Sequence, residues 1–101
     1  MNKVYSSEEI KSILYPLFMA NAVYRAVLFG SYAKGSATDK SDIDIVIDSK
    51  GELLNINFYG LLEEITQKLG KNIDLLEMSE INENSPIHEA IEREGVLLYA
   101  K

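Results

Sequence analysis

Residues 30–44 read GSYAKGSATDKSDID, a Gly-Ser pair followed, after ten residues, by two aspartates that flank one isoleucine. The apolar runs on either side, 24–29 and 43–47, predict strands. Successive strand residues point to opposite faces of a sheet, so Asp42 and Asp44 project together from one face. Two carboxylates within ~7 Å of each other on one face repel unless a cation or a hydrogen-bond donor lies between them. The stretch therefore predicts a divalent-metal site beside a turn suited to phosphate.

A helix is predicted ahead of this stretch. Ser6 and Glu9 have the spacing of a capping box, in which each side chain bonds the backbone of the other residue. Apolar residues then recur at the spacing of one helix face: Ile10, Ile13, Leu14, Leu17 and Phe18. Pro16 interrupts this pattern, so we expect a kink or a break near residues 12–15.

The other predicted elements alternate between strand and helix. We expect one helix to end at Gly70 and another, which begins at Ser85-Pro86, to end at Gly95. On that last helix we expect Ile87, Ala90 and Ile91 to face inward. In order, the strands and helices are strand 24–29, short helix 31–35, strand 42–48, helix 58–69, strand 72–78, helix 86–94 and strand 96–99. This order predicts one α/β domain, residues 1–101, with a small mixed sheet of about four strands covered by helices.

Composition excludes several classes of protein. The apolar share of 47% is normal for a globular chain and argues against disorder, and no apolar run reaches the ~18 residues of a membrane span. The net charge of −6 argues against direct nucleic-acid binding, which depends on basic residues. A nucleotide remains a compatible ligand because Mg²⁺ can supply positive charge locally. The absence of cysteine and of a signal-peptide apolar region fits the cytoplasm.

Metal-assisted nucleotidyl transfer needs three kinds of group, and candidates for all three are present. Asp42 and Asp44 offer the carboxylate oxygens that Mg²⁺ prefers. Gly30 lets the backbone approach phosphate without a Cβ, and a helix starting at Ser31 would add free amides. Asp74 lies in the apolar strand 72–78 and is the candidate third acid, because an unpaired acid in such a strand is costly. Two metals between such carboxylates would stabilise the attacking and leaving oxygens.

Less specific readings of the same acids stay open at this point. Asp42 and Asp44 could be the solvated start of a strand after a turn. Asp74 could form a structural ion pair with Lys71 or Lys34.

Taken together, the Gly-Ser pair, the acid pair and Asp74 resemble the nucleotidyltransferase superfamily of the DNA polymerase β type. Residues 29–38 and 41–45 look like its minimal (MNT) branch, which is often the antitoxin partner of a HEPN-domain toxin. This resemblance implies an α+β nucleotidyltransferase fold. It also implies transfer of AMP from ATP to a protein hydroxyl, a tyrosine of the cognate toxin, which silences the toxin.

The resemblance also implies a role for each motif residue. Gly30 and Ser31 would hold the triphosphate, and Lys34 stands where relatives commonly carry a basic residue. The catalytic and metal-binding carboxylates, around two Mg²⁺ ions, would be Asp42, Asp44 and Asp74.

A second hypothesis is a binding module without turnover, which neutralises its partner protein by steric cover. The presence of Asp74 favours catalysis, since a binding module has no need of a third acid. A protein partner is expected in either case, in an assembly of like or unlike subunits.

Overall fold

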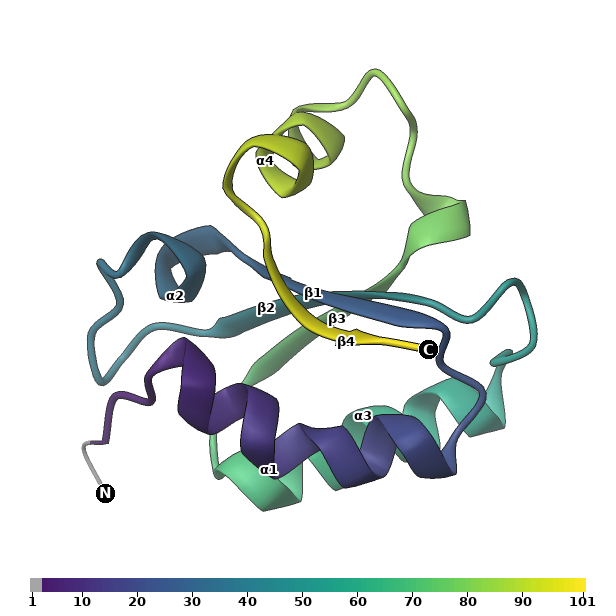
Figure 1. Cartoon of the computed structure of the whole chain (residues 1–101), viewed down its shortest axis with the longest axis horizontal. Coiled ribbons are helices and arrows are strands. Elements are labelled where there is room, and N and C mark those ends of the chain that lie inside the picture. Colours follow the sequence, from purple (N-terminus) through teal and green to yellow (C-terminus); the bar gives the residue numbers. More distant parts are fainter. Residues whose placement is uncertain (1–2) are drawn as a thin grey trace.

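The computed structural model describes residues 3–101, which form four strands and four α-helices (Figure 1). A short 3₁₀ helix, η1, spans Met78–Glu80. The helices and strands are α1 (Ser7–Ala20), β1 (Arg25–Phe29), α2 (Gly30–Lys34), β2 (Ile43–Asp48), α3 (Ile56–Leu69), β3 (Ile73–Glu77), α4 (Pro86–Glu94) and β4 (Val96–Ala100). Across the described residues, no helix is both long and apolar enough to cross a membrane.

The strands form one mixed sheet in the order β3-β2-β1-β4. β1 runs antiparallel to both of its neighbours, β2 and β4. β2 and β3 run parallel and are joined by the crossover helix α3. Helices α1 and α3 cover one face of the sheet, α4 lies over the other, and α2 sits at the end of the sheet where β1 finishes (Figure 1). The observed α/β class and four-stranded mixed sheet confirm the prediction from sequence.

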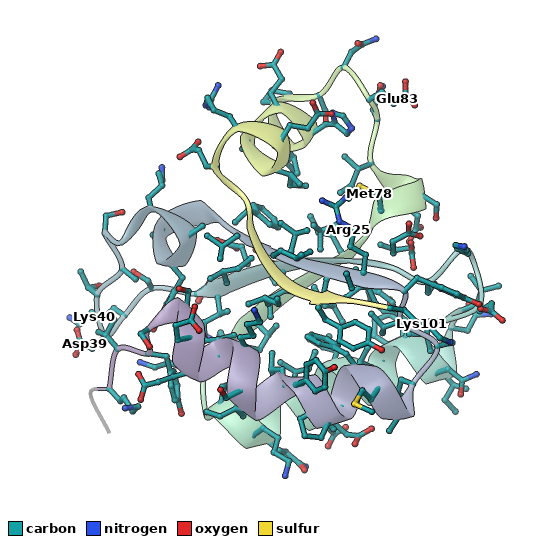
Figure 2. All side chains as sticks on the ribbon, in the orientation of Figure 1. Arg25, Asp39, Lys40, Met78, Glu83 and Lys101 are labelled. Carbon is teal, nitrogen blue, oxygen red and sulfur yellow. The ribbon has the colours of Figure 1, made fainter. Side chains whose placement is uncertain are left out.

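Strand alternation divides the apolar side chains between the two faces. The larger cluster lies between the sheet and helices α1 and α3, and its fully buried members include Phe18, Leu28, Ile45 and Ile65. The smaller cluster lies under α4 and contains Val27, Phe29, Val46 and Ile91. Figure 2 shows side chains filling the space on both sides of the sheet, with Asp39 and Lys40 toward one end of the molecule and Lys101 toward the other.

Two details of the sequence prediction were wrong. The break expected near Pro16 is absent, because α1 is continuous from Ser7 to Ala20; the kink, which was the other expectation, stays a prediction. Buried residues on both sides of Pro16, Leu14 and Leu17 among them, hold this face against the core, and that packing outweighs the ~3 kcal/mol cost of an interior proline. Ile87 does not face inward but is exposed, since Ile91 is the buried residue of α4.

Sequence analysis also missed a buried carboxylate at the end of β3. The Glu77 side chain is almost fully buried and accepts hydrogen bonds from the backbone N–H and the hydroxyl of Ser49. It also accepts one from the backbone N–H of Ser79, while the Ser49 hydroxyl accepts one from Leu53 N–H. These bonds join the C-terminal ends of the parallel strands β2 and β3, at the opposite end of the strands from Asp42.

We predict that Glu77→Ala lowers the free energy of unfolding by about 2 kcal/mol, because it leaves buried N–H and hydroxyl groups without an acceptor. Urea denaturation followed by circular dichroism measures the change. Glu80→Ala, an exposed acid three residues away, is the matched control and should change stability by less than about 0.5 kcal/mol. Equal effects of the two substitutions would contradict the role given to Glu77.

Candidate active site

Three carboxylates meet at the start of β2 and β3. Asp44 and Asp74 are register partners in the parallel pairing of these strands, so their side chains leave the same face of the sheet side by side. Asp42, two residues before Asp44, projects from that face too. Asp42 and Asp74 are exposed, whereas Asp44 is partly buried. The three acids that the sequence singled out are therefore brought together, with Asp44 in the middle.

The environment of Asp44 changes the pKa of its carboxyl group. Burial, then the charge of Asp74 and more weakly that of Asp42, raise the pKa of Asp44 to about 6 from an ordinary 3.8. Like charges raise an acid's pKa when no cation compensates them. The cluster is thus an acidic site that favours a bound cation.

Gly30 lies directly against this cluster. Its backbone has a φ of +72°, and a Cβ placed on it would lie 2.1 Å from Oδ2 of Asp44. Only glycine fits there, both for its left-handed φ and for the space that the carboxylate occupies. The tight packing joins the Gly-Ser turn to the acid pair, so a phosphate bound at Gly30 would lie next to Asp44.

Ser31 and Lys34 lie on the short helix that follows. Ser31 is partly exposed at the first turn of α2, where backbone N–H groups lack helical partners. Lys34, one turn further, is exposed, with Nζ 3.8 Å from a carboxylate oxygen of Glu94. Such an exposed pair is weak and leaves the amine able to turn toward an anion. The predicted phosphate contact of Lys34 stays a prediction.

The structural ion pair considered for Asp74 does not form. Lys34 faces Glu94, and Lys71 Nζ donates to the backbone carbonyl of Asp39 at 3.0 Å. Within the part of the chain that the structure describes, neither lysine pairs with Asp74. Asp74 therefore remains free for a ligand.

The acids fit an open magnesium site better than a closed one. Among residues 3–101, no three His, Cys, Asp or Glu side chains are arranged closely enough to hold a metal by themselves. Mg²⁺ usually keeps several waters and takes one or two carboxylates together with substrate phosphates. The carboxyl oxygens of Asp42, Asp44 and Asp74 suit that arrangement, in which a nucleotide completes the coordination.

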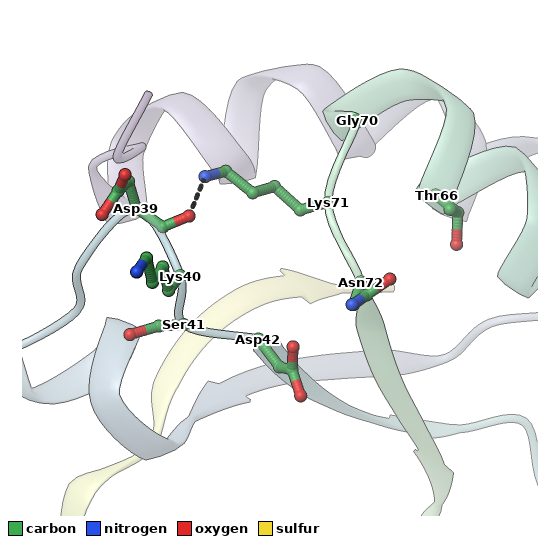
Figure 3. Close-up of a pocket in the computed structure, with 8 residues that line it drawn as sticks. All are labelled: Asp39, Lys40, Ser41, Asp42, Thr66, Gly70, Lys71 and Asn72. Atoms are coloured by element: carbon green, nitrogen blue, oxygen red, sulfur yellow. Dashed lines mark hydrogen bonds between the residues drawn. The ribbon is translucent and has the colours of Figure 1, made fainter. Parts of the chain in front are cut away.

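A pocket of about 520 Å³ opens beside Asp42 (Figure 3). Its walls come from the loop 39–42, from the turn 70–72 before β3, and from Thr66 of α3. The Lys71 side chain reaches across it to the Asp39 carbonyl (Figure 3). Sequence analysis missed this pocket, because its walls come from separate segments that only the tertiary structure brings together.

Comparison with known proteins identifies the family. Residues 8–101 match the model of the family described as polymerase beta, nucleotidyltransferase. The chain belongs to this nucleotidyltransferase family. It is 34% identical over 93 residues to the protein adenylyltransferase MntA of Thermococcus cleftensis, covering 88% of this chain and 92% of that one. A Methanocaldococcus jannaschii protein, provisionally named a protein adenylyltransferase, is 36% identical over 75 residues, or 73% of this chain and 80% of that one.

Solved structures share the fold of this nucleotidyltransferase. A toxin–antitoxin crystal structure with AMP-PNP contains a chain with a TM-score of 0.77 and 22% identity, over 90% of this chain and 73% of that one. A complex of a tri-AMPylated Shewanella oneidensis HEPN toxin with an MNT antitoxin contains a chain that matches with a TM-score of 0.71 and 20% identity. The match covers 94% of this chain and 73% of that one. The predicted minimal nucleotidyltransferase fold is confirmed.

We predict that Gly30→Ala is more damaging than Gly35→Ala. Both glycines have a left-handed φ, +72° and +76°, so both substitutions cost about 1–2 kcal/mol of backbone strain. Only the Cβ at position 30 meets the Asp44 carboxylate, since a Cβ at position 35 has no atom within 4 Å. Thermal unfolding of the two variants measures the difference, and equal melting temperatures would contradict the close approach.

We also predict that Asp44→Asn stabilises the metal-free protein at pH 7. The Asp44 carboxyl group holds its proton more tightly in the folded chain than in the unfolded chain. The folded protein therefore loses stability as the pH rises from about 4 through about 6. Because Asp44 is partly exposed, solvent screens part of this effect. The shift in pKa then corresponds to roughly 1 kcal/mol in the free energy of unfolding, or a rise in Tm of about 4–8 °C for the variant.

Differential scanning fluorimetry in EDTA tests this expectation. At pH 4 the melting temperatures of wild type and Asp44→Asn should converge, because the aspartate is then largely neutral as well. A variant that is less stable than wild type at pH 7 would show that Asp44 is not under charge repulsion.

Proposed function

We propose that this nucleotidyltransferase moves AMP from ATP to a hydroxyl group of a partner protein and so acts as an antitoxin. The observation that carries the proposal is the convergence of Asp42, Asp44 and Asp74 beside the backbone of Gly30. Support for the adenylyl group and the protein acceptor comes from relatives named protein adenylyltransferases.

Each site residue has a defined task in this reaction. Gly30 and Ser31 bind the β- and γ-phosphates through backbone N–H groups, with Lys34 as a further cation. Asp42, Asp44 and Asp74 would hold Mg²⁺, as two ions in the full site. When bound, the metal supplies positive charge to the phosphate oxygens and to the attacking oxygen.

The acids also orient the acceptor. Asp74 accepts a hydrogen bond from the attacking hydroxyl and takes its proton as the new bond forms between that oxygen and the α-phosphorus. The bond from the α-phosphorus to the oxygen bridging to the β-phosphate breaks, and pyrophosphate leaves. Positioning and charge stabilisation account for most of the catalysis in phosphate-transfer reactions of this type.

A HEPN-domain toxin is the partner that we infer, with a tyrosine as acceptor. Complexes of MNT antitoxins with HEPN toxins, one of them tri-AMPylated, share the fold of this chain and support that choice. The reaction would run in the cytoplasm, where ATP is abundant.

We predict that the double variant Asp42→Asn/Asp44→Asn transfers no label from α-labelled ATP to a co-expressed HEPN-domain partner. Asp74→Asn should lower the rate by at least about 100-fold, the usual contribution of a general base. Asp48→Asn, on the same strand and the same face but at its far end, is the matched control and should label normally. Autoradiography of the purified partner gives the measurement.

The binding hypothesis predicts a different result. Equal labelling by the double variant would refute catalysis by these acids. A variant that no longer labels the partner yet still suppresses its toxicity would show neutralisation by steric cover instead.

A further inference from the structure

We propose that Glu94 competes with the triphosphate of the nucleotide for Lys34, so that this lysine changes partner from the carboxylate to phosphate when ATP binds. This role rests on the nucleotide binding of the function proposed above. It makes Glu94, which lies on α4 outside the acid cluster, a determinant of the affinity for ATP. Because Glu94 acts through Lys34, it is a positioning residue rather than a catalytic one.

Helix α4 covers the face of the sheet that carries the acids (Figure 1). The apolar cluster under α4 contains Val46, which follows Asp44 by two residues on β2 and so points to the same face. The cluster also contains Phe29, the residue directly before Gly30. Helices α2 and α4 contact each other. The end of α4 is therefore close to the helix that starts at the Gly-Ser turn.

The C-terminal end of α4 packs directly on β1. The backbone N–H of Gly95, the residue after Glu94, donates to the carbonyl of Ile91 at 2.9 Å. A Cβ placed on Gly95 would lie 2.6 Å from Cγ1 of Val27 and would also meet the Ile91 carbonyl oxygen. Since no side chain fits between this turn and the strand, the backbone that carries Glu94 is held at a defined place on the sheet.

The carboxylate of Glu94 lies between two cations. One oxygen is 3.8 Å from Nζ of Lys34, and the other accepts a hydrogen bond from the guanidinium group of Arg93 at 3.1 Å. The Glu94 side chain is 24% exposed, whereas that of Lys34 is 53% exposed. Among residues 3–101, Glu94 has the one carboxylate within 4 Å of the Lys34 amine. The lysine is thus held loosely by a carboxylate that it shares with Arg93.

A triphosphate is a stronger partner for this lysine than Glu94. A distance of 3.8 Å is too long for a hydrogen bond, and an exposed pair of this kind contributes little stability. Ser31 and Lys34 are three residues apart on α2 and so lie on the same side of that helix. A triphosphate at Ser31 would bring several charged oxygens to that side, and hydrogen bonds from an ammonium group to phosphate are short and strong.

The change of partner has a cost for nucleotide binding. ATP must replace the pair between Lys34 and Glu94, so part of the attraction between the lysine and phosphate is lost. A neutral side chain at position 94 removes this competition. The affinity for ATP should therefore rise when the charge of Glu94 is removed.

The isosteric substitution Glu94→Gln tests the competition, because it removes the charge and keeps the size of the side chain. With MgCl₂ present, the Kd for ATP measured by isothermal titration calorimetry should fall about threefold, the size expected for loss of an exposed ion pair. A Kd that is unchanged or higher would overturn the proposal.

A double-mutant cycle with Lys34→Gln separates the change of partner from a general effect of charge. Lys34→Gln alone should raise the Kd for ATP about tenfold, because a charged hydrogen bond to phosphate is lost. In that background, Glu94→Gln should change the Kd by less than about 1.5-fold, since no lysine remains to be released. The same threefold fall in both backgrounds would mean that Glu94 only repels the triphosphate, which refutes a change of partner.

Glu89→Gln is the matched control on the same helix. Glu89 is exposed, and within the part of the chain that the structure describes its carboxylate has no cation within 4 Å. This variant makes the same change of charge and should leave the Kd for ATP within about 1.5-fold of the wild-type value. A threefold fall in this control as well would assign the effect to net charge and refute the role of Glu94.

The kinetics of AMP transfer give a second readout. Glu94→Gln should lower KM for ATP about threefold and leave kcat unchanged, because Glu94 touches no reacting atom. A fall in kcat would show that Glu94 shapes the site itself, which contradicts the competition.

Failure of this role can be told apart from failure of the transferase function. If the wild type binds no ATP, the proposed function falls, and the role of Glu94 falls with it. If the wild type binds ATP and transfers AMP while Glu94→Gln changes neither Kd nor KM, only the competition for Lys34 is refuted.

Discussion

The register between two parallel strands is the constraint on which the rest of this protein depends. β2 and β3 begin level with each other, so Asp44 and Asp74 stand side by side with Asp42 close by. Burial and, after it, repulsion from Asp74 and Asp42 raise the pKa of Asp44. At the opposite end of the same strands, the buried carboxylate of Glu77 ties the exits together through Ser49. The fold thus maintains an acidic site that a cation can stabilise.

A second constraint is the close approach of Gly30 to Asp44. The backbone at Gly30 lies where any side chain would meet the carboxylate. The Gly-Ser turn and the paired acids are therefore parts of one junction between β1 and β2, rather than two separate motifs. Pyrophosphate and metal would meet at this junction, while Asp74 lies on β3, on the other side of β2 from β1.

Much of the fold could be predicted because its signals are local. The capping box at Ser6 and Glu9 forms as expected, and each predicted strand and helix is found within about two residues of its predicted position, whereas the 3₁₀ helix η1 was not predicted. The errors occurred where tertiary packing outweighed local preference. Pro16 lies within a continuous helix that has buried residues on both sides of it, and Ile87 is exposed whereas Ile91 of the same helix is buried. Glu77 gave no signal, since its partner Ser49 lies 28 residues away in the chain.

The sequence by itself determined that Asp42 and Asp44 share one face and that a glycine turn ends the preceding strand. Both follow from the two-residue period of a strand and from the backbone freedom of glycine. Only the tertiary structure decided that Asp74 adjoins Asp44 and that the turn 70–72 walls a pocket at Asp42. Strand pairing order is a non-local outcome, set by how the crossover helix α3 packs back onto the sheet, and no spacing along the chain encodes it directly.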